Sequence, residues 1–402
     1  MITGRDIIVL SNIAWSFSWQ RHQQFAVRLA RKNRVLFVEP PVSPLLPFHD
    51  RELFRAALRK KFGGTTRINR NLVLFFPPPA LPGGGVSLAV QRLNQAILSR
   101  AIRRDASLLG FSSPLVWNYS PYYSGTSFSL GQKSTIYDCV DEMSKEGGGI
   151  KGKVARKLER ETLARSDLVL TTSRYLFRTR RPYNRRTFLL PNGADFDRYQ
   201  AAGPAGENVH PEIERFPAPR IGCSGTFNRR VDEDLVRWIA ERRPDWSLLF
   251  IGPATSIPQC LNNVPNVHFL GNVPPEQLPG YLTKLSAGIV PYRNSRETRA
   301  IHPVKVYDYL AAGLPVVSTS FGDIEYFREV IKIAGNREGF LSHLDAVLGE
   351  NDPRGRDRRT DFARRNSWDQ RIEEIGRILG ETGIIEKTSP GEEKISSPPG
   401  RS

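Results

Sequence analysis

The chain has 402 residues, of which 39% are hydrophobic and 25% charged, and a net charge of +17. This length supports two domains of ordinary size, and the composition excludes a largely disordered chain. No stretch approaches the roughly 20 apolar residues of a membrane-spanning helix, and the apolar run 7–10 is too short for the core of a signal peptide. Cys139, Cys223 and Cys260 are too far apart for a disulfide framework or a zinc site. We therefore expect a cytoplasmic protein.

The positive charge is concentrated in the first half of the chain. Residues 1–200 contain 32 Lys and Arg against 14 Asp and Glu, a net +18, whereas the remainder contains 26 against 27, a net −1. A strongly basic half favours a polyanionic partner, which is either nucleic acid or the surface of an anionic membrane. The two halves are therefore expected to have different functions.

Strands alternate with helices in the first half, which predicts an α/β domain with a doubly wound parallel sheet over residues 1–200. In chain order, we expect a strand at 6–10, a helix at 20–31, and strands at 34–38 and 72–75. A helix at 86–104 and strands at 115–117 and 135–137 follow. A helix at 154–165 and strands at 168–171 and 188–190 complete the domain.

Residues 201–219 are rich in Gly, Pro and polar residues, which is typical of an interdomain linker. A second domain of the same class is expected over 220–366, with strands at 220–224, 248–251, 267–270, 288–290 and 315–318. Ser367 and Gln370 have the spacing of a capping box and predict a terminal helix within 367–385. The tail 386–402 has the composition of a disordered segment.

The segment 301–313 has the signals of a helix with an open start. Pro303 is expected at its first position and Gly313 just past its end. No Ser, Thr, Asp or Asn caps this start, and Lys305 lies where the helix dipole disfavours a cation. A bound diphosphate would accept the free N–H groups and pair with Lys305, and Asp308 on the same face could bind a ribose diol. An ordinary surface pair between Lys305 and Asp308 explains these residues equally well.

A second candidate lies in residues 222–230, Gly-Cys-Ser-Gly-Thr-Phe-Asn-Arg-Arg, which follow the first strand of the second half. Ligands of open α/β sheets bind beyond the carboxyl ends of the strands, so this loop and residues 302–308 could face one crevice. Gly225 would let the backbone approach a ligand, and Arg229 or Arg230 could clamp a phosphate. The alternative is a simple turn with solvated arginines. The loop matches neither GxGxxG nor GxxxxGK[ST].

Several short motifs recur in the order found in one enzyme family. They are Trp-Gln-Arg at 19–21, Tyr-Asp-Cys-Val-Asp-Glu at 137–142, Ser-Asp-Leu-Val-Leu-Thr-Thr-Ser at 166–173, Leu-Pro-Asn-Gly-Ala-Asp at 190–195, Ile-Gly-Pro at 251–253, Asn-Val-His-Phe-Leu-Gly at 266–271 and the run 303–318. Together they resemble the retaining, family 4-type glycosyltransferases of the GT-B fold. The nearest resemblance is to the branch of teichuronic-acid and cell-surface polysaccharide biosynthesis enzymes, and it covers nearly the whole ordered chain.

The resemblance implies two Rossmann-like domains that face each other across a cleft, with the acceptor on the first, the donor on the second and the terminal helix crossing back. It implies a hexosyltransferase-type enzyme that moves a sugar, with retention, from a nucleotide-sugar to a lipid-linked or polysaccharide acceptor in cell-envelope glycan synthesis. The donor-binding residues are then expected to be Gly225, Arg229, Arg230, His302, Pro303, Val304, Lys305 and Asp308. The chain departs from the family's EX7E motif, because Ala300 stands where the first Glu, which contacts the donor sugar, would be.

The catalytic residues are expected to be Asp138, Asp141, Arg229 and Lys305. Cleavage of a sugar–phosphate bond leaves negative charge on the diphosphate, which the two cations would stabilise, and positive charge on the sugar, which a carboxylate would stabilise. Asp138 and Asp141 follow a strand of the first domain, and each could instead cap a turn or a helix. Asp-x-x-Asp is not the DxD of metal-dependent transferases, so no metal and no cofactor are expected.

Gln20, Arg21 and His22 follow the first strand and are the expected acceptor-binding residues, although His22 could equally be a surface residue of the following helix. A basic amphipathic helix is expected at 51–62, Arg-Glu-Leu-Phe-Arg-Ala-Ala-Leu-Arg-Lys-Lys-Phe. Such a helix suits an anionic lipid interface, or packs on its own domain. With the charge of the first half, it predicts a peripheral protein on the inner face of the plasma membrane.

Two other functions fit parts of the sequence. A nucleic-acid-binding protein would account for the basic charge but not for the uncapped helix at Pro303, so we expect no nucleic-acid partner. A nucleotide-sugar epimerase could use the same fold without an acceptor, and the fold cannot separate the two enzymes.

Overall fold

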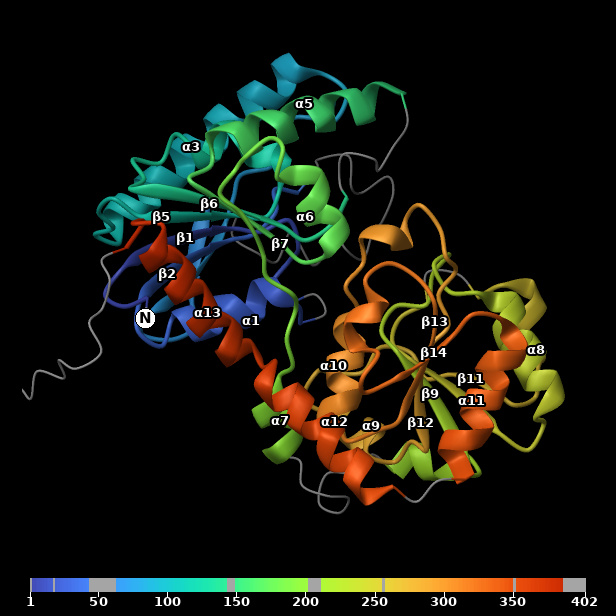
Figure 1. Ribbon diagram of the computed structural model, residues 1–402. Coiled ribbons are helices and arrows are strands. Elements are labelled where there is room, and N and C mark those ends of the chain that lie inside the picture. Colours follow the sequence, from blue (N-terminus) through green and yellow to red (C-terminus); the bar gives the residue numbers. More distant parts are fainter. Residues whose placement is uncertain are drawn as a thin grey trace, which may run out of the picture.

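The computed structural model describes residues 2–16, 19–42, 63–142, 149–201, 211–254, 257–349 and 352–385. Two lobes, each built on a sheet flanked by helices, lie side by side (Figure 1). The expected helix at 51–62, residues 202–210 of the expected linker and the tail 386–402 lie outside the described residues. No helix within the described ranges is long and apolar enough to cross a membrane.

The first lobe contains an eight-stranded sheet in the order β3-β4-β2-β1-β5-β6-β7-β8. Every neighbouring pair is parallel except β3 and β4, which are antiparallel. The strands are β1 Asp6–Leu10, β2 Arg34–Val38, β3 Gly64–Arg67, β4 Leu72–Phe76, β5 Leu115–Asn118, β6 Ser134–Cys139, β7 Leu168–Thr171 and β8 Thr187–Leu189. Most of their side chains are buried on both faces, as expected of a parallel sheet covered by helices.

The helices of the first lobe are α1 Arg21–Leu29, α3 Leu88–Leu108, α4 Ser124–Ser127, α5 Gly149–Arg165 and α6 Arg174–Arg180. Helix α1 packs with the terminal helix α13, Trp368–Glu381, on one face of the sheet, and α3 and α5 lie on the other side (Figure 1). Phe25 and Trp368 meet edge to face at 5.5 Å in this core. The terminal helix therefore crosses back to the first lobe, as the sequence predicted.

The second lobe contains a six-stranded parallel sheet in the order β11-β10-β9-β12-β13-β14. Its strands are β9 Arg220–Ser224, β10 Ser247–Ile251, β11 Val267–Phe269, β12 Ala287–Val290, β13 Val316–Thr319 and β14 Lys332–Ala334. Its helices are α8 Glu233–Arg242, α9 Leu278–Leu282, α10 Val304–Ala311, α11 Arg337–Gly349 and α12 Pro353–Arg365, and α7, Phe196–Ala201, precedes the lobe. The strand order reverses between β9 and β12. Ligands of such sheets bind beside this point, at the carboxyl ends of the strands.

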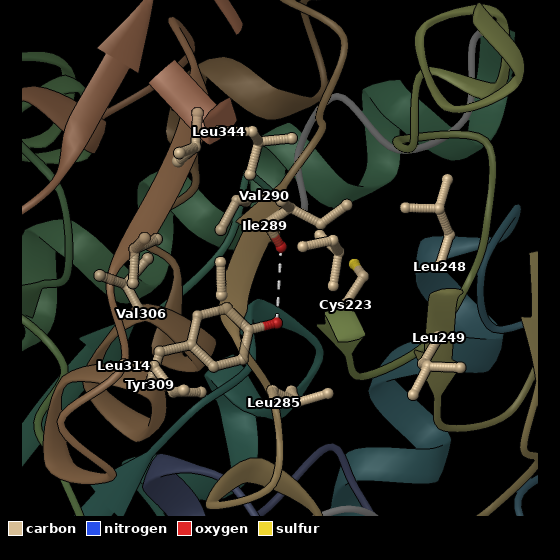
Figure 2. Close-up of a cluster of buried hydrophobic side chains, with 14 of the residues drawn as sticks. Cys223, Leu248, Leu249, Leu285, Ile289, Val290, Val306, Tyr309, Leu314 and Leu344 are labelled. Atoms are coloured by element: carbon tan, nitrogen blue, oxygen red, sulfur yellow. Dashed lines mark hydrogen bonds between the residues drawn. The ribbon is translucent and has the colours of Figure 1, made fainter. Parts of the chain in front are cut away.

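Helix α10 is anchored in the core of the second lobe by one face. Val306 and Tyr309 point from α10 into the buried cluster, and the Tyr309 hydroxyl donates to the main-chain oxygen of Ile289 at 3.5 Å (Figure 2). Gly288 leaves room for the Tyr309 ring, since a Cβ there would lie 2.7 Å from it. The opposite face of α10, which carries Lys305 and Asp308, lines the cleft between the lobes.

The chain passes between the lobes at two places that are bonded to each other. Main-chain hydrogen bonds of 2.9 Å join Ala194 to Asn366 and Trp368 to Ala194. Gly193 allows this approach, because a Cβ there would lie 2.9 to 3.0 Å from main-chain atoms of residues 366–368. Ser367 caps α13 by accepting from the main-chain nitrogen of Gln370 at 3.3 Å.

Candidate functional site

A cavity of about 910 Å³ lies between the lobes. Loops that follow β1 and β6 line it from the first lobe, and loops that follow β9, β10 and β12 line it from the second. Gln20, Asp141, Arg229 and Lys305, four of the residues singled out from the sequence, border it. The expected crevice therefore exists and is shared by both lobes.

The start of α10 opens into this cavity without a capping side chain. Pro303 is the N-cap residue, with φ −74° and ψ 116°, and no side chain accepts from the first amides of the helix. We expected Pro303 to be the first helical residue. In the structure it precedes the helix as the N-cap, and the helix begins at Val304. Gly313 follows the end at φ 76°, as predicted. The N–H groups of this first turn therefore have no side-chain partner.

Lys305 lies in the first turn of α10 and is enclosed by polar groups of the second lobe. Its Nζ lies 3.7 Å from Cys223 Sγ and 4.8 Å from the centre of the Tyr292 ring. Burial opposes its charge, but Cys223, Tyr292 and Tyr309 outweigh burial and raise the pKa of Lys305. Lys305 forms no ion pair with another described residue, so the surface pair with Asp308 that we considered is not formed. A cationic side chain thus borders the cavity without an ion-pair partner in the described parts of the chain.

Two glycines bring the loops after β9 and β10 close to Lys305. Gly225 has φ 91°, and a Cβ there would lie 3.6 Å from the end of the Lys305 side chain. Gly252 has φ 142°, and a Cβ there would lie 2.5 Å from the oxygen of Gly225. Both conformations favour glycine. The expected role of Gly225, close approach of backbone to a ligand, matches this geometry.

The two arginines of the β9 loop are in different surroundings. The Arg229 guanidinium binds Glu297 with both arms, at 2.7 and 2.8 Å, and 80% of its side chain is exposed. Arg230 faces Asp141 of the first lobe across the cavity. Partial desolvation at the cavity wall raises the pKa of the Asp141 carboxyl, although the residue is exposed to solvent, and Arg230 opposes that shift. Asp141 forms no ion pair within the described ranges, so its carboxylate is available to a ligand.

The structure corrects the expected position of Asp138. Its carboxylate is fully buried behind the cavity wall, where Oδ2 accepts from Arg21 Nε at 2.8 Å and from Trp117 Nε1 at 3.1 Å. Arg21 also donates to the main-chain oxygens of Leu190 and Pro191, both at 3.1 Å. Asp138 therefore neutralises and holds Arg21, and does not reach the reacting centre as we expected.

His22 borders the cavity but is buried, contrary to the surface alternative. Its Nε2 donates to Asn12 Oδ1 at 2.9 Å, and its ring lies 3.8 Å from that of Tyr119. Burial, aided by Arg21, lowers the pKa of His22 to about 3, so the imidazole is neutral. Nδ1 of His22 and Nη2 of Arg21 have no partner among the described residues. Gln20, the N-cap residue of α1, lies beside them at the cavity.

The side chain of His302 also lies elsewhere than expected. It is buried in its own lobe, where Nδ1 donates to Asp323 at 3.2 Å and Nε2 accepts from the Tyr307 hydroxyl at 2.9 Å. Burial lowers the pKa of His302, although Asp323 acts in the opposite direction. A nucleotide-sugar in the cavity could therefore contact the backbone of His302 but not its imidazole. The main-chain oxygen of His302 accepts a hydrogen bond from Asn192 at 2.8 Å. The imidazole positions the loop before α10.

Asp308 lies one turn after Lys305 and has an acidic neighbour from the interlobe segment. Burial and Asp195 raise the pKa of Asp308 to about 7, against the opposing effects of Arg198 and the Tyr199 hydroxyl. Asp195 in turn accepts from Gln24 and Arg28 of α1 at 3.1 and 2.9 Å. Sequence reasoning missed this group, although the motif that ends in Asp195 had been noticed.

Ala300, which replaces the first Glu of EX7E, lies in the seam between the lobes. Its side chain is 2% exposed and packs in a cluster with Tyr137, Cys139 and Leu176 of the first lobe. Glu297, the nearest glutamate in the sequence, binds Arg229. No group of three or more His, Cys, Asp or Glu side chains in the described parts of the chain could hold a metal ion. Metal independence remains a prediction.

The comparisons with known proteins agree with this architecture. Residues 218–348 match the family model of Glycosyl transferases group 1. A protein of Bacillus subtilis (strain 168), assigned to teichuronic acid biosynthesis as the glycosyltransferase TuaH, is 25% identical over 286 residues, which cover 66% of this chain and 71% of that protein.

Solved structures share the fold over nearly the whole chain. Sucrose-phosphate synthase from Thermosynechococcus elongatus has a TM-score of 0.67 at 13% identity, covering 94% of this chain and 98% of that one. The catalytic domain of starch synthase IV from Arabidopsis thaliana has a TM-score of 0.64 at 11% identity, covering 95% and 99%. The fold and the matched second lobe thus define a GT-B glycosyltransferase. The expected fold and the expected enzyme class, a hexosyltransferase-type glycosyltransferase, are confirmed.

Proposed function

We propose that the chain transfers a hexosyl group from a nucleotide-sugar to a glycan or lipid-linked acceptor of the cell envelope, with retention at the sugar carbon. One observation carries the donor assignment. The uncapped start of α10 and the unpaired cation Lys305 point into a cavity large enough for a sugar nucleotide. Helix N-termini and enclosed cations together bind phosphate.

The residues divide between the two products of bond cleavage. Lys305, Arg230 and, after release from Glu297, Arg229 stabilise the departing diphosphate beside the amides of Val304 and Lys305. Asp141 lies opposite Arg230 and favours the positive charge that develops on the sugar. Asp308 binds the ribose diol.

The acceptor is assigned to the first-lobe wall formed by Gln20, Arg21 and His22. Nδ1 of His22 can accept and Nη2 of Arg21 can donate, and neither has a partner among the described residues; both atoms are buried, so acceptor hydroxyl groups would reach them only if this wall shifts. The cell-envelope assignment draws on the role in teichuronic acid biosynthesis given to TuaH. We retain residues 51–62 as a membrane-binding helix on the inner face of the plasma membrane, and propose that neither a metal nor a cofactor takes part.

A thermal-shift screen of the purified protein against nucleotide sugars tests the donor site. We expect one base to raise the melting temperature, because a ligand at 100 times its Kd stabilises by about 2.7 kcal/mol. Lys305→Ala should abolish the shift, each variant being compared with its own ligand-free midpoint. Lys284→Ala is the matched control. Lys284 forms an ion pair with Glu214 at 3.1 Å, and neither residue lines the cavity. An unchanged shift in Lys305→Ala refutes the assignment.

A further inference from the structure

The basic charge of the first lobe forms an ordered surface on helix α5. Lys153, Arg156, Lys157 and Arg160 are all exposed and follow one another at i, i+3, i+4 and i+7. This spacing places the four cations in one stripe along the helix, opposite the buried residues Ala155, Leu158 and Thr162.

The stripe continues onto α6 and the loop that follows it. Arg178, Arg181 and Arg185 line an open hollow of about 500 Å³ together with Phe177 and Pro182. Two contacts fasten this loop to α5. Asn184 donates to the main-chain oxygens of Leu163 and Ser166 at 2.8 and 2.7 Å, and the Arg160 guanidinium lies 5.9 Å from the Tyr183 ring. The α5–α6 face is defined here as Lys153, Arg156, Lys157, Arg160, Arg178, Arg181 and Arg185.

Three described carboxylates on or beside α5 are already engaged. Glu142 and Glu159 both bind the buried Arg180, at 2.7 and 2.8 Å, and Glu161 pairs with Arg92 of α3. None of the seven cations of the face forms an ion pair with another described residue. Like charges at this spacing destabilise the free protein slightly, so an anionic partner gains their full attraction.

We propose that the α5–α6 face docks on an anionic lipid bilayer, with the headgroup phosphates against its cations. Clusters of four to eight Lys and Arg bind acidic membrane surfaces in this way. Two exposed apolar side chains favour a bilayer over nucleic acid. Ile150 is 63% exposed at the start of α5 and Tyr183 is 50% exposed beside Arg160. Tyr183 suits the headgroup level and Ile150 the acyl boundary, whereas an isoleucine has no ring on which a base could stack.

The position of the face links docking to the cleft. Helix α6 begins at Arg174, whose main-chain nitrogen donates to Asp323 of the second lobe at 3.3 Å, so the face borders the seam between the lobes. A bilayer on this face would lie against the first lobe, which carries the proposed acceptor wall, and this suits an acceptor held in the membrane. Only this last consequence depends on the proposed function.

Vesicle co-sedimentation of the full chain tests the docking surface without any substrate. Vesicles of phosphatidylcholine, with and without phosphatidylglycerol, are compared for the native chain and three double variants. Arg156→Gln with Arg160→Gln changes the stripe, and Arg178→Gln with Arg181→Gln changes the hollow. Arg242→Gln with Lys332→Gln is the control, because these exposed cations lie on the second lobe and the loss of charge is the same.

We expect binding only to the anionic vesicles, weakened by salt. Each face variant should reduce the affinity by about tenfold, since each cation near a membrane contributes about 1 kcal/mol before screening. The control should bind as the native chain does, and equal melting temperatures would show that all variants are folded. Equal losses in face and control variants overturn the proposal. Tighter binding to duplex DNA than to vesicles at equal phosphate, or release from vesicles by the same concentration of inorganic phosphate, also overturns it.

Discussion

At the scale of single residues, Asp308 shows how the donor site affects stability. Its carboxyl is enclosed beside Asp195, and its pKa in the folded chain is about 7, well above the ordinary value of 3.8. The folded protein therefore holds this proton more tightly than the unfolded chain does. The resulting stabilisation is complete below pH 4 and is lost as the pH rises to about 7. Ionised Asp308 thus lowers the stability of the folded protein above about pH 7, and a bound ligand with hydroxyl donors can offset this loss.

Asp308→Asn should consequently raise the melting temperature at pH 8 and change it less at pH 4, where the aspartate is neutral in the folded protein and only partly ionised in the unfolded chain. Unfolding measured by circular dichroism across this range gives the difference curve. The control is Asp357→Asn, an exposed acidic residue of α12. A difference curve that is flat with pH, or that slopes the other way, contradicts the argument.

The site residues differ in how far the sequence could predict them. The sequence placed Gly225, Asp141 and Lys305 correctly at the cavity, because loops at the carboxyl ends of parallel strands share one edge. The sequence could not predict how deeply each side chain is buried. Asp138 lies near the end of β6, three positions before Asp141, but is paired with Arg21, 117 positions earlier in the chain. His302 lies next to the donor helix in sequence, and yet its partner Asp323 turns it into the core.

At the scale of elements, the apolar strands were predictable and the polar edges were not. The predicted strands 6–10, 34–38, 168–171 and 220–224 match β1, β2, β7 and β9. Their continuous apolar runs reflect burial on both faces. Strand β3, Gly-Thr-Thr-Arg, is an exposed antiparallel edge, and β14 has three residues, so neither has a hydrophobic pattern. Each is defined by its pairing with a neighbouring strand, β3 with β4 and β14 with β13.

The loop that leads into α10 is fixed by contacts with both lobes. Asp323 accepts from the main-chain nitrogen of Arg174 in the first lobe and from His302 in the second. Gly322, at φ 45°, lets this loop pack closely, because a Cβ there would lie 2.4 Å from the oxygen of Thr298. Ala300 fills the seam beside it. The position of the donor helix is therefore coupled to the contact between the lobes.

Asp323→Asn should weaken this coupling. The substitution replaces two charge-assisted hydrogen bonds by neutral ones in a buried place, which should lower the free energy of unfolding by about 2 kcal/mol. Hydrogen exchange should become faster both in α6 and at the start of α10. Asp352→Asn is the control, since Asp352 caps α12 within one lobe by accepting from Gly355 at 2.8 Å. Faster exchange in α6 alone would show that Asp323 does not transmit position to α10.

At the scale of the whole molecule, the two lobes are held together on both sides of the cavity. The paired segments around Ala194 and Asn366 and the return of α13 form one side, and the seam of Ala300 and Asp323 forms the other. Residues from both lobes consequently meet across one cavity, with Asp141 opposite Arg230. A donor bound to the second lobe thereby faces the acceptor wall of Gln20, Arg21 and His22.

The central claim is that a donor's diphosphate completes the open start of α10. Crystals grown with UDP, ADP or GDP test it most directly. The account predicts phosphate oxygens within hydrogen-bonding distance of the amide of Val304 or Lys305 and of Lys305 Nζ, with Arg229 turned away from Glu297. A diphosphate bound elsewhere in the cavity, with the first turn of α10 untouched, would contradict it.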